Sequence, residues 1–99
     1  MVFRIVRGLI SLNNENQRQQ AAELGKRLTG LGYEAEVQED AVSLTKPAKI
    51  ESVVSELVQV CEPMGWDFWK DCDLAEYEQT NGKVRSYYRF GRVHRDDES

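Results

Sequence analysis

The tetrapeptide Thr80-Asn81-Gly82-Lys83 constrains the fold of this chain more than any other segment. Asn-Gly suits the centre of a type I′ turn, because both central residues need positive φ and these two residue types tolerate it. The sequence therefore predicts a long β-hairpin, with strands on either side of this turn between Trp66 and Val93. A two-residue turn also fixes which residues pair. The predicted pairs are Glu78 with Arg85, Glu76 with Tyr87, Ala75 with Tyr88, and Asp73 with Phe90.

This register divides the predicted hairpin into an apolar face and a polar face. The apolar face holds Ala75, Tyr77, Val84, Tyr88 and Phe90. The polar face holds Glu76, Glu78, Arg85, Tyr87 and Arg89. Because side chains alternate between the two faces along a strand, this segregation supports the register.

Two segments have the spacing of amphipathic helices. The first begins after Asn14, an N-cap residue with Gln17 in capping-box position, and its apolar stripe is Ala21, Leu24, Leu28 and Leu31. The second has the strongest helical period of the chain, formed by Ile50, Val53, Val54, Leu57, Val60 and Cys61. Pro47 is predicted in its first turn, and Pro63 should end it near Glu62.

Shorter segments have the alternation of β-strands. Val2 to Leu12 is apolar on both faces, which predicts a central strand that is partly covered on each side. Tyr33 to Gln38 alternates between apolar and polar residues, and Val42 and Leu44 form the inner face of a return strand. The full order predicts an α+β fold. We expect a ferredoxin-like split β-α-β pattern with an additional C-terminal hairpin strand, and two helices packed on one face of an antiparallel sheet.

The chain has the size of one domain, and we expect residues 1–94 to form it, with residues 95–99 as a flexible C-terminal tail. Arg4 and Arg7 interrupt the N-terminal apolar segment, which argues against a secretory signal, and no apolar run is long enough to span a membrane. The expected location is therefore the cytoplasm. The two cysteines, Cys61 and Cys72, are expected to be reduced, with at least one of them buried.

The net charge of −4 conceals a strong segregation of charge along the sequence. Residues 1–33 carry +3 and residues 79–99 carry +2, whereas residues 34–78 carry −9. Such a bipolar surface can steer charged partners, and its acidic middle would repel a phosphate backbone.

No motif of the sequence predicts catalysis, a cofactor or a metal site. His94 is the single histidine, and no pattern supplies it with a nucleophile or an orienting carboxylate. Cys61, Cys72 and His94 lack the close pairs typical of structural zinc sites. We therefore expect a protein that is not an enzyme and that binds no cofactor and no metal.

The leading hypothesis is a small regulatory domain, an adaptor or an inhibitor, that binds another protein; a homodimer stays open. Tryptophan is enriched at protein interfaces, and three aromatic residues cluster directly after the second predicted helix. The polar hairpin face is the other candidate. The predicted interaction surface is therefore Trp66, Phe68, Trp69, Glu76, Glu78, Arg85, Tyr87 and Arg89. Whether the three aromatic residues belong to the core or to the interface stays open at this point.

The alternative is a nucleic-acid-binding module, because aromatics between arginines on a sheet can stack bases and neutralise phosphates. The predicted contacts are Arg4, Arg7, Arg85, Tyr87, Arg89 and Arg92. RNA-recognition motifs use aromatics at alternate positions of an open face, whereas the predicted register leaves only Tyr87 there. Together with the acidic middle, this makes nucleic acid the weaker hypothesis. The residues neither support nor exclude a small ligand between helices and sheet.

Overall fold

The computed structural model describes residues 4–78, 84–89 and 92–95 of the chain, the last two ranges as strand backbone. The elements in chain order are β1 (Arg4–Ser11), α1 (Glu15–Gly30), β2 (Glu34–Val37), β3 (Ala41–Lys46), α2 (Ile50–Cys61), the 3₁₀ helix η1 (Glu62–Met64), α3 (Phe68–Asp71), β4 (Cys72–Glu78), β5 (Val84–Arg89) and β6 (Arg92–Arg95). None of the helices in these ranges is both long enough and apolar enough to cross a membrane.

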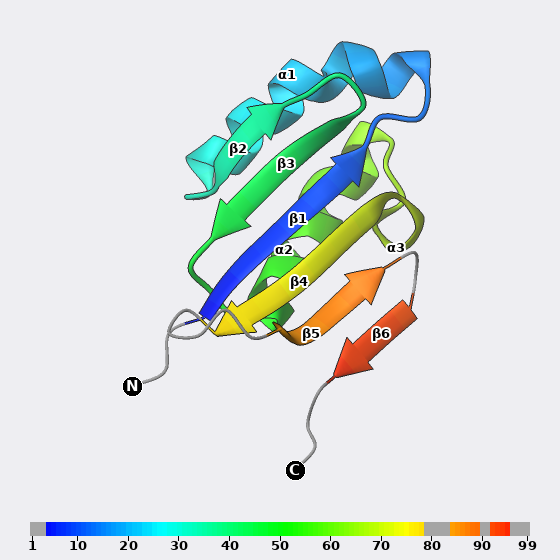
Figure 1. The fold of residues 1–99 in the computed structure, drawn as a ribbon. Coiled ribbons are helices and arrows are strands. Elements are labelled where there is room, and N and C mark those ends of the chain that lie inside the picture. Colours follow the sequence, from blue (N-terminus) through cyan, green and yellow to red (C-terminus); the bar gives the residue numbers. More distant parts are fainter. Residues whose placement is uncertain (1–3, 79–83, 90–91, 96–99) are drawn as a thin grey trace.

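The strands form one six-stranded sheet in the order β2-β3-β1-β4-β5-β6, and each neighbouring pair is antiparallel. Figure 1 shows this sheet in front, with α1 and α2 behind it on one face. The predicted α+β class and antiparallel sheet are confirmed. We call the face turned away from α1 and α2 the open face.

The core lies between the two long helices and the covered face of the sheet. It includes most of both predicted helical stripes, and Val42 and Leu44 face it from β3 as expected. The helix residues that are completely or almost completely buried are Ala21, Leu24, Leu28, Ile50, Val53, Leu57 and Cys61. Burial of these aliphatic side chains is the main force that holds α1 and α2 on the sheet.

Local sequence explains where the two long helices begin and end. The side chain of Asn14 accepts a hydrogen bond from the backbone N–H of Gln17 at 2.9 Å, which confirms the predicted cap of α1. α2 ends at Cys61, and Pro63 lies in the η1 turn that follows, also as predicted. Pro47 was expected inside the first turn of α2, but the helix begins later, at Ile50.

β1 is central in the sheet, as predicted, but the helices cover only one of its faces. Val6 and Ile10 are fully buried. Arg7 is exposed, and Leu9 keeps 44% of its surface exposed. Arg7 and Leu9 therefore belong to the open face, which α1 and α2 do not cover.

The segment from Trp66 to Asp71 is not the start of a hairpin strand, which corrects the prediction. Gly65 has a left-handed φ of 99°, which turns the chain after η1. Asp67 then caps the short helix α3 by accepting a hydrogen bond from the backbone N–H of Trp69 at 3.0 Å. These two turn signals override the aromatic β propensity of the segment, and the strand begins only at Cys72.

The predicted hairpin register is wrong by one residue. In the structure Asp73 pairs with Arg89 and Ala75 pairs with Tyr87. The register shifts again at an irregularity between Glu76 and Tyr77. The Asn81–Gly82 turn itself lies outside the described residues.

The two faces assigned to β4 are also reversed in the structure. Cys72, Leu74 and Glu76 are buried on the helix side. Ala75 and Tyr77 are half-buried and line the open face instead.

The predicted strand from Val84 to Val93 is divided into β5 and β6, which pair with each other. β6 is therefore a separate edge strand, whereas the sequence predicts one continuous strand here. It includes Arg95, which had been assigned to the C-terminal tail; residues 96–99 lie outside the described residues.

Candidate functional site

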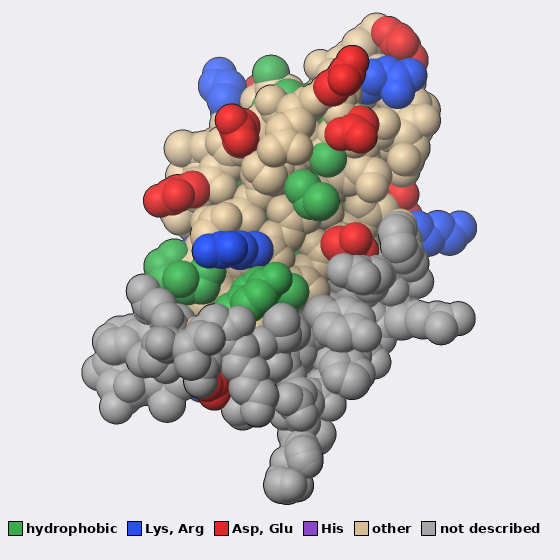
Figure 2. Space-filling view, viewed as in Figure 1, with side chains coloured by type: hydrophobic (Ala, Val, Ile, Leu, Met, Phe, Trp, Pro, Cys, Tyr) green, Lys and Arg blue, Asp and Glu red, His purple; other side chains and the backbone are tan. Residues whose placement is uncertain are grey.

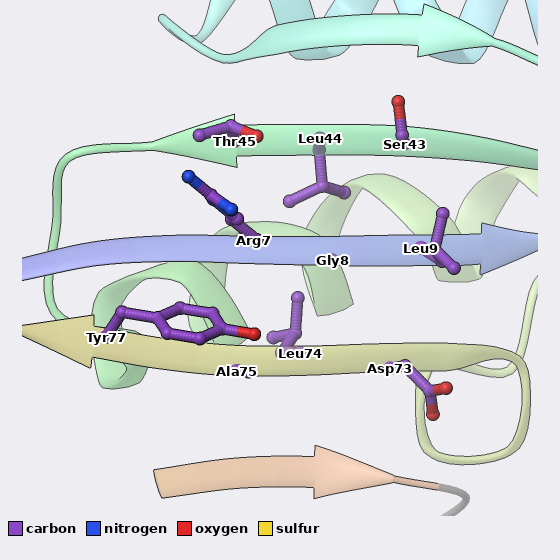
Figure 3. Close-up of a pocket in the computed structure, with 10 residues that line it drawn as sticks. All are labelled: Arg7, Gly8, Leu9, Ser43, Leu44, Thr45, Asp73, Leu74, Ala75 and Tyr77. Atoms are coloured by element: carbon purple, nitrogen blue, oxygen red, sulfur yellow. The ribbon is translucent and has the colours of Figure 1, made fainter. Parts of the chain in front are cut away.

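The open face of the sheet contains a hollow of about 330 Å³ over the middle of β1. Strands β3, β1 and β4 supply its lining, as Figure 3 shows. The lining residues are Arg7, Gly8, Leu9, Ser43, Leu44, Thr45, Asp73, Leu74, Ala75 and Tyr77. It is a shallow depression open to solvent rather than an enclosed cavity.

Gly8 forms the floor of this hollow. It pairs with Leu44 on one side and with Leu74 on the other, and these two buried leucines fill the space behind it on the helix side. A Cβ atom at Gly8 would lie 2.4 Å from Cδ2 of Leu74 and 2.7 Å from the backbone oxygen of Asp73. Only glycine fits between these neighbours.

The rim combines a cation, an aromatic ring and exposed apolar surface. The guanidinium carbon of Arg7 lies 5.5 Å from the centre of the Tyr77 ring, within the range of a cation–π contact. Leu9 stands on the same strand two residues later. In Figure 3 the Tyr77 ring lies along β4, with its hydroxyl pointing toward the middle of the hollow.

Acidic residues flank the hollow on the side of β2. Glu34 and Glu36 are exposed and pair with Thr45 and Ser43, which line the hollow. Figure 2 shows this face, with acidic side chains gathered over the part where β2 runs. The described part of the open face is therefore mixed in charge, with an acidic flank.

Burial removes three residues from the predicted interaction surface. Trp66, Phe68 and Glu76 are 2%, 1% and 4% exposed. Trp66 is held inside by a hydrogen bond from its indole Nε1 to the backbone oxygen of Ser11, at 2.7 Å. Of the aromatic cluster only Trp69 is exposed, and it packs edge-to-face on Phe68 with 4.9 Å between ring centres.

The remaining residues of that predicted surface lie on the hairpin strands. Glu78 is half-buried at the end of β4. Arg85, Tyr87 and Arg89 are on β5, and their side chains lie outside those that the structure describes.

Glu76 is buried because it serves the fold. One carboxylate oxygen accepts a hydrogen bond from the backbone N–H of Ile50 at 2.9 Å, and the other pairs with Arg4 at 3.1 Å. The first N–H groups of a helix lack partners within the helix, so this carboxylate satisfies one of them for α2. Lys49 at the N-cap position makes no side-chain cap, and that missing cap is the signal that sequence analysis could have used.

The same contact weakens the nucleic-acid alternative. Arg4 was a predicted phosphate contact, but its guanidinium pairs with the buried Glu76 and its side chain is only 25% exposed. Arg7 is exposed on the open face. Arg85, Tyr87, Arg89 and Arg92 lie on β5 and β6, with side chains outside the described ones.

A second polar cluster joins Tyr33, Lys46 and Glu56 away from the hollow. The Tyr33 hydroxyl donates to Glu56 at 2.6 Å, and Lys46 reaches the same carboxylate oxygen at 3.1 Å. These contacts hold the pKa of Glu56 below its usual value, chiefly through the Tyr33 hydrogen bond, while burial raises the pKa of Tyr33. Lys46 also lies 4.6 Å from the centre of the Tyr33 ring. This cluster ties β3 to α2 and is structural.

The two cysteines are free and buried, as expected. A hydrogen bond with Cys61, followed by burial, raises the pKa of the Cys72 thiol, so this cysteine does not resemble an activated nucleophile. Within residues 4–78, 84–89 and 92–95, no three His, Cys, Asp or Glu residues are placed to hold a metal ion. The expectations of no enzyme activity, no cofactor and no metal stay predictions.

Comparisons with protein-family models, with curated proteins and with solved structures return no match to this chain. The residues of the open face are therefore the basis for a functional proposal.

Proposed function

We propose that this chain is a small, non-enzymatic regulatory domain, an adaptor or an inhibitor, that binds another protein through the open face of its sheet. The observation that supports it is the hollow over β1, where the apolar surface of Leu9, Ala75 and Tyr77 lies among charged and hydroxyl side chains. Protein interfaces have this composition, with an apolar centre and a polar rim. The contact residues would be Arg7, Leu9, Ser43, Thr45, Asp73, Ala75 and Tyr77, which we call the open-face patch.

Residue types in the patch favour a protein over a nucleic acid. Arginine and tyrosine carry much of the binding energy in protein interfaces, and Arg7 lies within cation–π distance of Tyr77. Leu9 offers exposed apolar surface beside them. By contrast, Asp73 in the patch and the acidic flank of β2 oppose a phosphate backbone.

We also infer a ferredoxin-like arrangement for the first four strands. The spatial order β2-β3-β1-β4 supports it, with α1 connecting β1 to β2 and α2 connecting β3 to β4. In this assignment β5 and β6 extend the sheet beyond β4. The buried, free thiols support a reducing compartment such as the cytoplasm.

Affinity capture from the source cells tests the binding face. Leu9→Glu places a charge in the patch, whereas Gln59→Glu adds the same charge to an exposed position of α2 in the helix layer. We expect wild type and Gln59→Glu to retain the same specific partner and Leu9→Glu to lose it, with all variants equally folded by circular dichroism. Equal capture by the two variants would place the binding surface elsewhere.

The nucleic-acid alternative has its own readout. Single-stranded oligonucleotides should show no binding by fluorescence anisotropy, even at low salt. Binding that weakens steeply between about 50 and about 200 mM salt would instead indicate phosphate contacts and overturn the proposal.

A further inference from the structure

The residue pairs of the sheet form rows that run from one edge strand, β2, to the other edge strand, β6. One row of paired residues runs Glu36, Ser43, Leu9, Asp73, Arg89, Arg92 from β2 to β6. The next open-face row runs Glu34, Thr45, Arg7, Ala75, Tyr87, His94. Each of these rows begins with an acid on one edge strand and ends with a basic residue type on the other. The row between them begins with Ala35 and ends with Val93.

Both edge strands are short and complementary in sequence. β2 reads Glu-Ala-Glu-Val and β6 reads Arg-Val-His-Arg. Glu34, Glu36 and Val37 are exposed, with Val37 at 46%. Figure 1 shows the two strands at opposite sides of the sheet.

The backbone of β2 is oriented for strand addition at Ala35. Gln38 N–H donates to the backbone oxygen of Ala41 at 2.8 Å, so alternation directs the backbone groups of Glu36 and Glu34 toward β3. Those of Ala35 and Val37 are therefore directed away from β3, toward the edge. Carried across the register, the same alternation directs the backbone groups of Val93 away from β5.

Strand directions also match. All neighbouring strands are antiparallel and the sheet has six of them, so β2 and β6 run in opposite directions. A second copy placed beside β2 with its helices on the same side thus presents its β6 in antiparallel orientation. We propose that the chain associates head-to-tail with further copies of itself through antiparallel pairing of β2 with β6.

In this joint the rows of one copy continue into the next without a stagger. Glu36 would stand opposite Arg92 of the next copy, Glu34 opposite His94, and Ala35 opposite Val93. The Glu36–Arg92 pair joins opposite charges, which is favourable across two strands, Glu34 can accept a hydrogen bond from His94, and the Ala35 pair would add backbone hydrogen bonds. On the helix side, a hollow of about 540 Å³ between α1 and β2 offers room for an apolar residue. It is lined mainly by Ala22, Gly25, Ala35 and Val37.

The same edge disfavours the symmetric alternative. Pairing β2 with β2 of a second copy would bring Glu34 or Glu36 opposite another glutamate, and like charges facing each other across two strands are destabilising. The heterologous joint differs, because a joined pair keeps the acidic edge of one copy and the basic edge of the other free for further copies. Since sheets twist by roughly 20–25° per strand, repeated joints lead to an open helical assembly rather than a dimer.

Analytical ultracentrifugation of the full chain tests the proposal. We expect the weight-average mass to rise with protein concentration at about 50 mM NaCl and to fall at about 500 mM, because salt screens the edge charges. Glu34→Lys/Glu36→Lys and Arg92→Glu/His94→Glu should each be monomeric alone. Mixed one-to-one, the two variants should associate again, since each supplies the edge that the other lacks.

Two controls separate edge pairing from general charge effects. Glu15→Lys/Glu23→Lys changes the net charge by the same amount as Glu34→Lys/Glu36→Lys, but at exposed positions of α1, and should associate as wild type does. Ala35→Pro removes an N–H that points away from β3, so it should block association while circular dichroism stays native.

Four results would overturn the proposal. They are a monomeric wild type at every concentration at low salt, reversal variants that still associate alone, a mixture that stays monomeric, and a folded Ala35→Pro that associates normally. Should Ala35→Pro not fold, the mixing experiment decides by itself.

Discussion

Glu76 on β4 accepts a hydrogen bond from the backbone N–H of Ile50, so a strand side chain closes the first turn of α2. The same carboxylate pairs with Arg4 on β1. One buried side chain thereby connects two central strands to the helix that supplies much of the core. The position of α2 on the sheet depends on this contact as well as on apolar packing.

Replacing Glu76 with Ala should lower the free energy of unfolding by about 3 kcal/mol, because Ile50 N–H and Arg4 both lose a buried partner. Glu76→Gln should lower it less, since an amide oxygen can still accept from Ile50. Urea denaturation measures both. A change below about 0.5 kcal/mol for Glu76→Ala would mean that the contact is unimportant for the fold.

Gly8→Ala should be destabilising by roughly 1–3 kcal/mol, because its Cβ would overlap the side chain of Leu74 and the backbone of Asp73. Gly30→Ala is the matched control, since a Cβ at the end of α1 meets no atom within 4 Å. That control should be neutral or slightly stabilising. Thermal melting of the two variants compares them directly, and equal midpoints would contradict the close approach at Gly8.

Leu57→Ala should cost about 2–5 kcal/mol, because Leu57 is completely buried in the stripe of α2 and its truncation leaves a cavity. Gln59→Ala, on an exposed position of the same helix, serves as the reference. Chemical denaturation of both variants gives the difference. Similar stabilities would show that α2 does not pack as described.

Tyr33→Phe should raise the pKa of Glu56 toward its ordinary value, because the Tyr33 hydrogen bond is the largest cause of the lowering. A carboxylate with a depressed folded pKa stabilises the fold above its unfolded pKa, and this contribution is lost as pH falls through the folded pKa. The acid limb of the stability curve should therefore be shallower in Tyr33→Phe. An NMR titration of the Glu56 carboxyl carbon follows the shift, and an unchanged titration would rule out the coupling.

The native chain should react very slowly with a thiol reagent such as Ellman's reagent. Cys61 and Cys72 are buried, and the raised pKa of Cys72 keeps that thiol protonated at neutral pH. Denaturant should release both thiols at once. Rapid labelling of either cysteine under native conditions would show that the end of α2 opens locally.

The two long helices could be predicted from sequence because their apolar residues are periodic and their boundaries are marked by single residues. Asn14 and Pro63 mark boundaries through backbone chemistry that acts within a few residues. Leu24 and Leu57 belong to apolar stripes at helical spacing, and each stripe is buried only when that side of its helix packs on the sheet. Tertiary context reinforced these local preferences and did not compete with them.

The face of β4 could not be predicted in the same way. Cys72 and Leu74 alternate with Ala75 and Tyr77, so both faces of this strand offer apolar residues. The charge of Glu76 indicates an outer face. In the structure it is buried instead, where it accepts a hydrogen bond from the backbone N–H of Ile50 at the start of α2. Because the candidate site lies on the open face, the reversed faces of β4 also moved Glu76 out of the predicted interaction surface.

The two tryptophans, three residues apart, stand in opposite surroundings: Trp66 is 2% exposed and Trp69 is 41% exposed. Their fluorescence therefore contains two separable signals. A small quencher such as acrylamide should reach Trp69 in the native chain but Trp66 only when the core opens. The molecule thus carries its own pair of optical reporters, one for the surface at α3 and one for the interior, without any attached label.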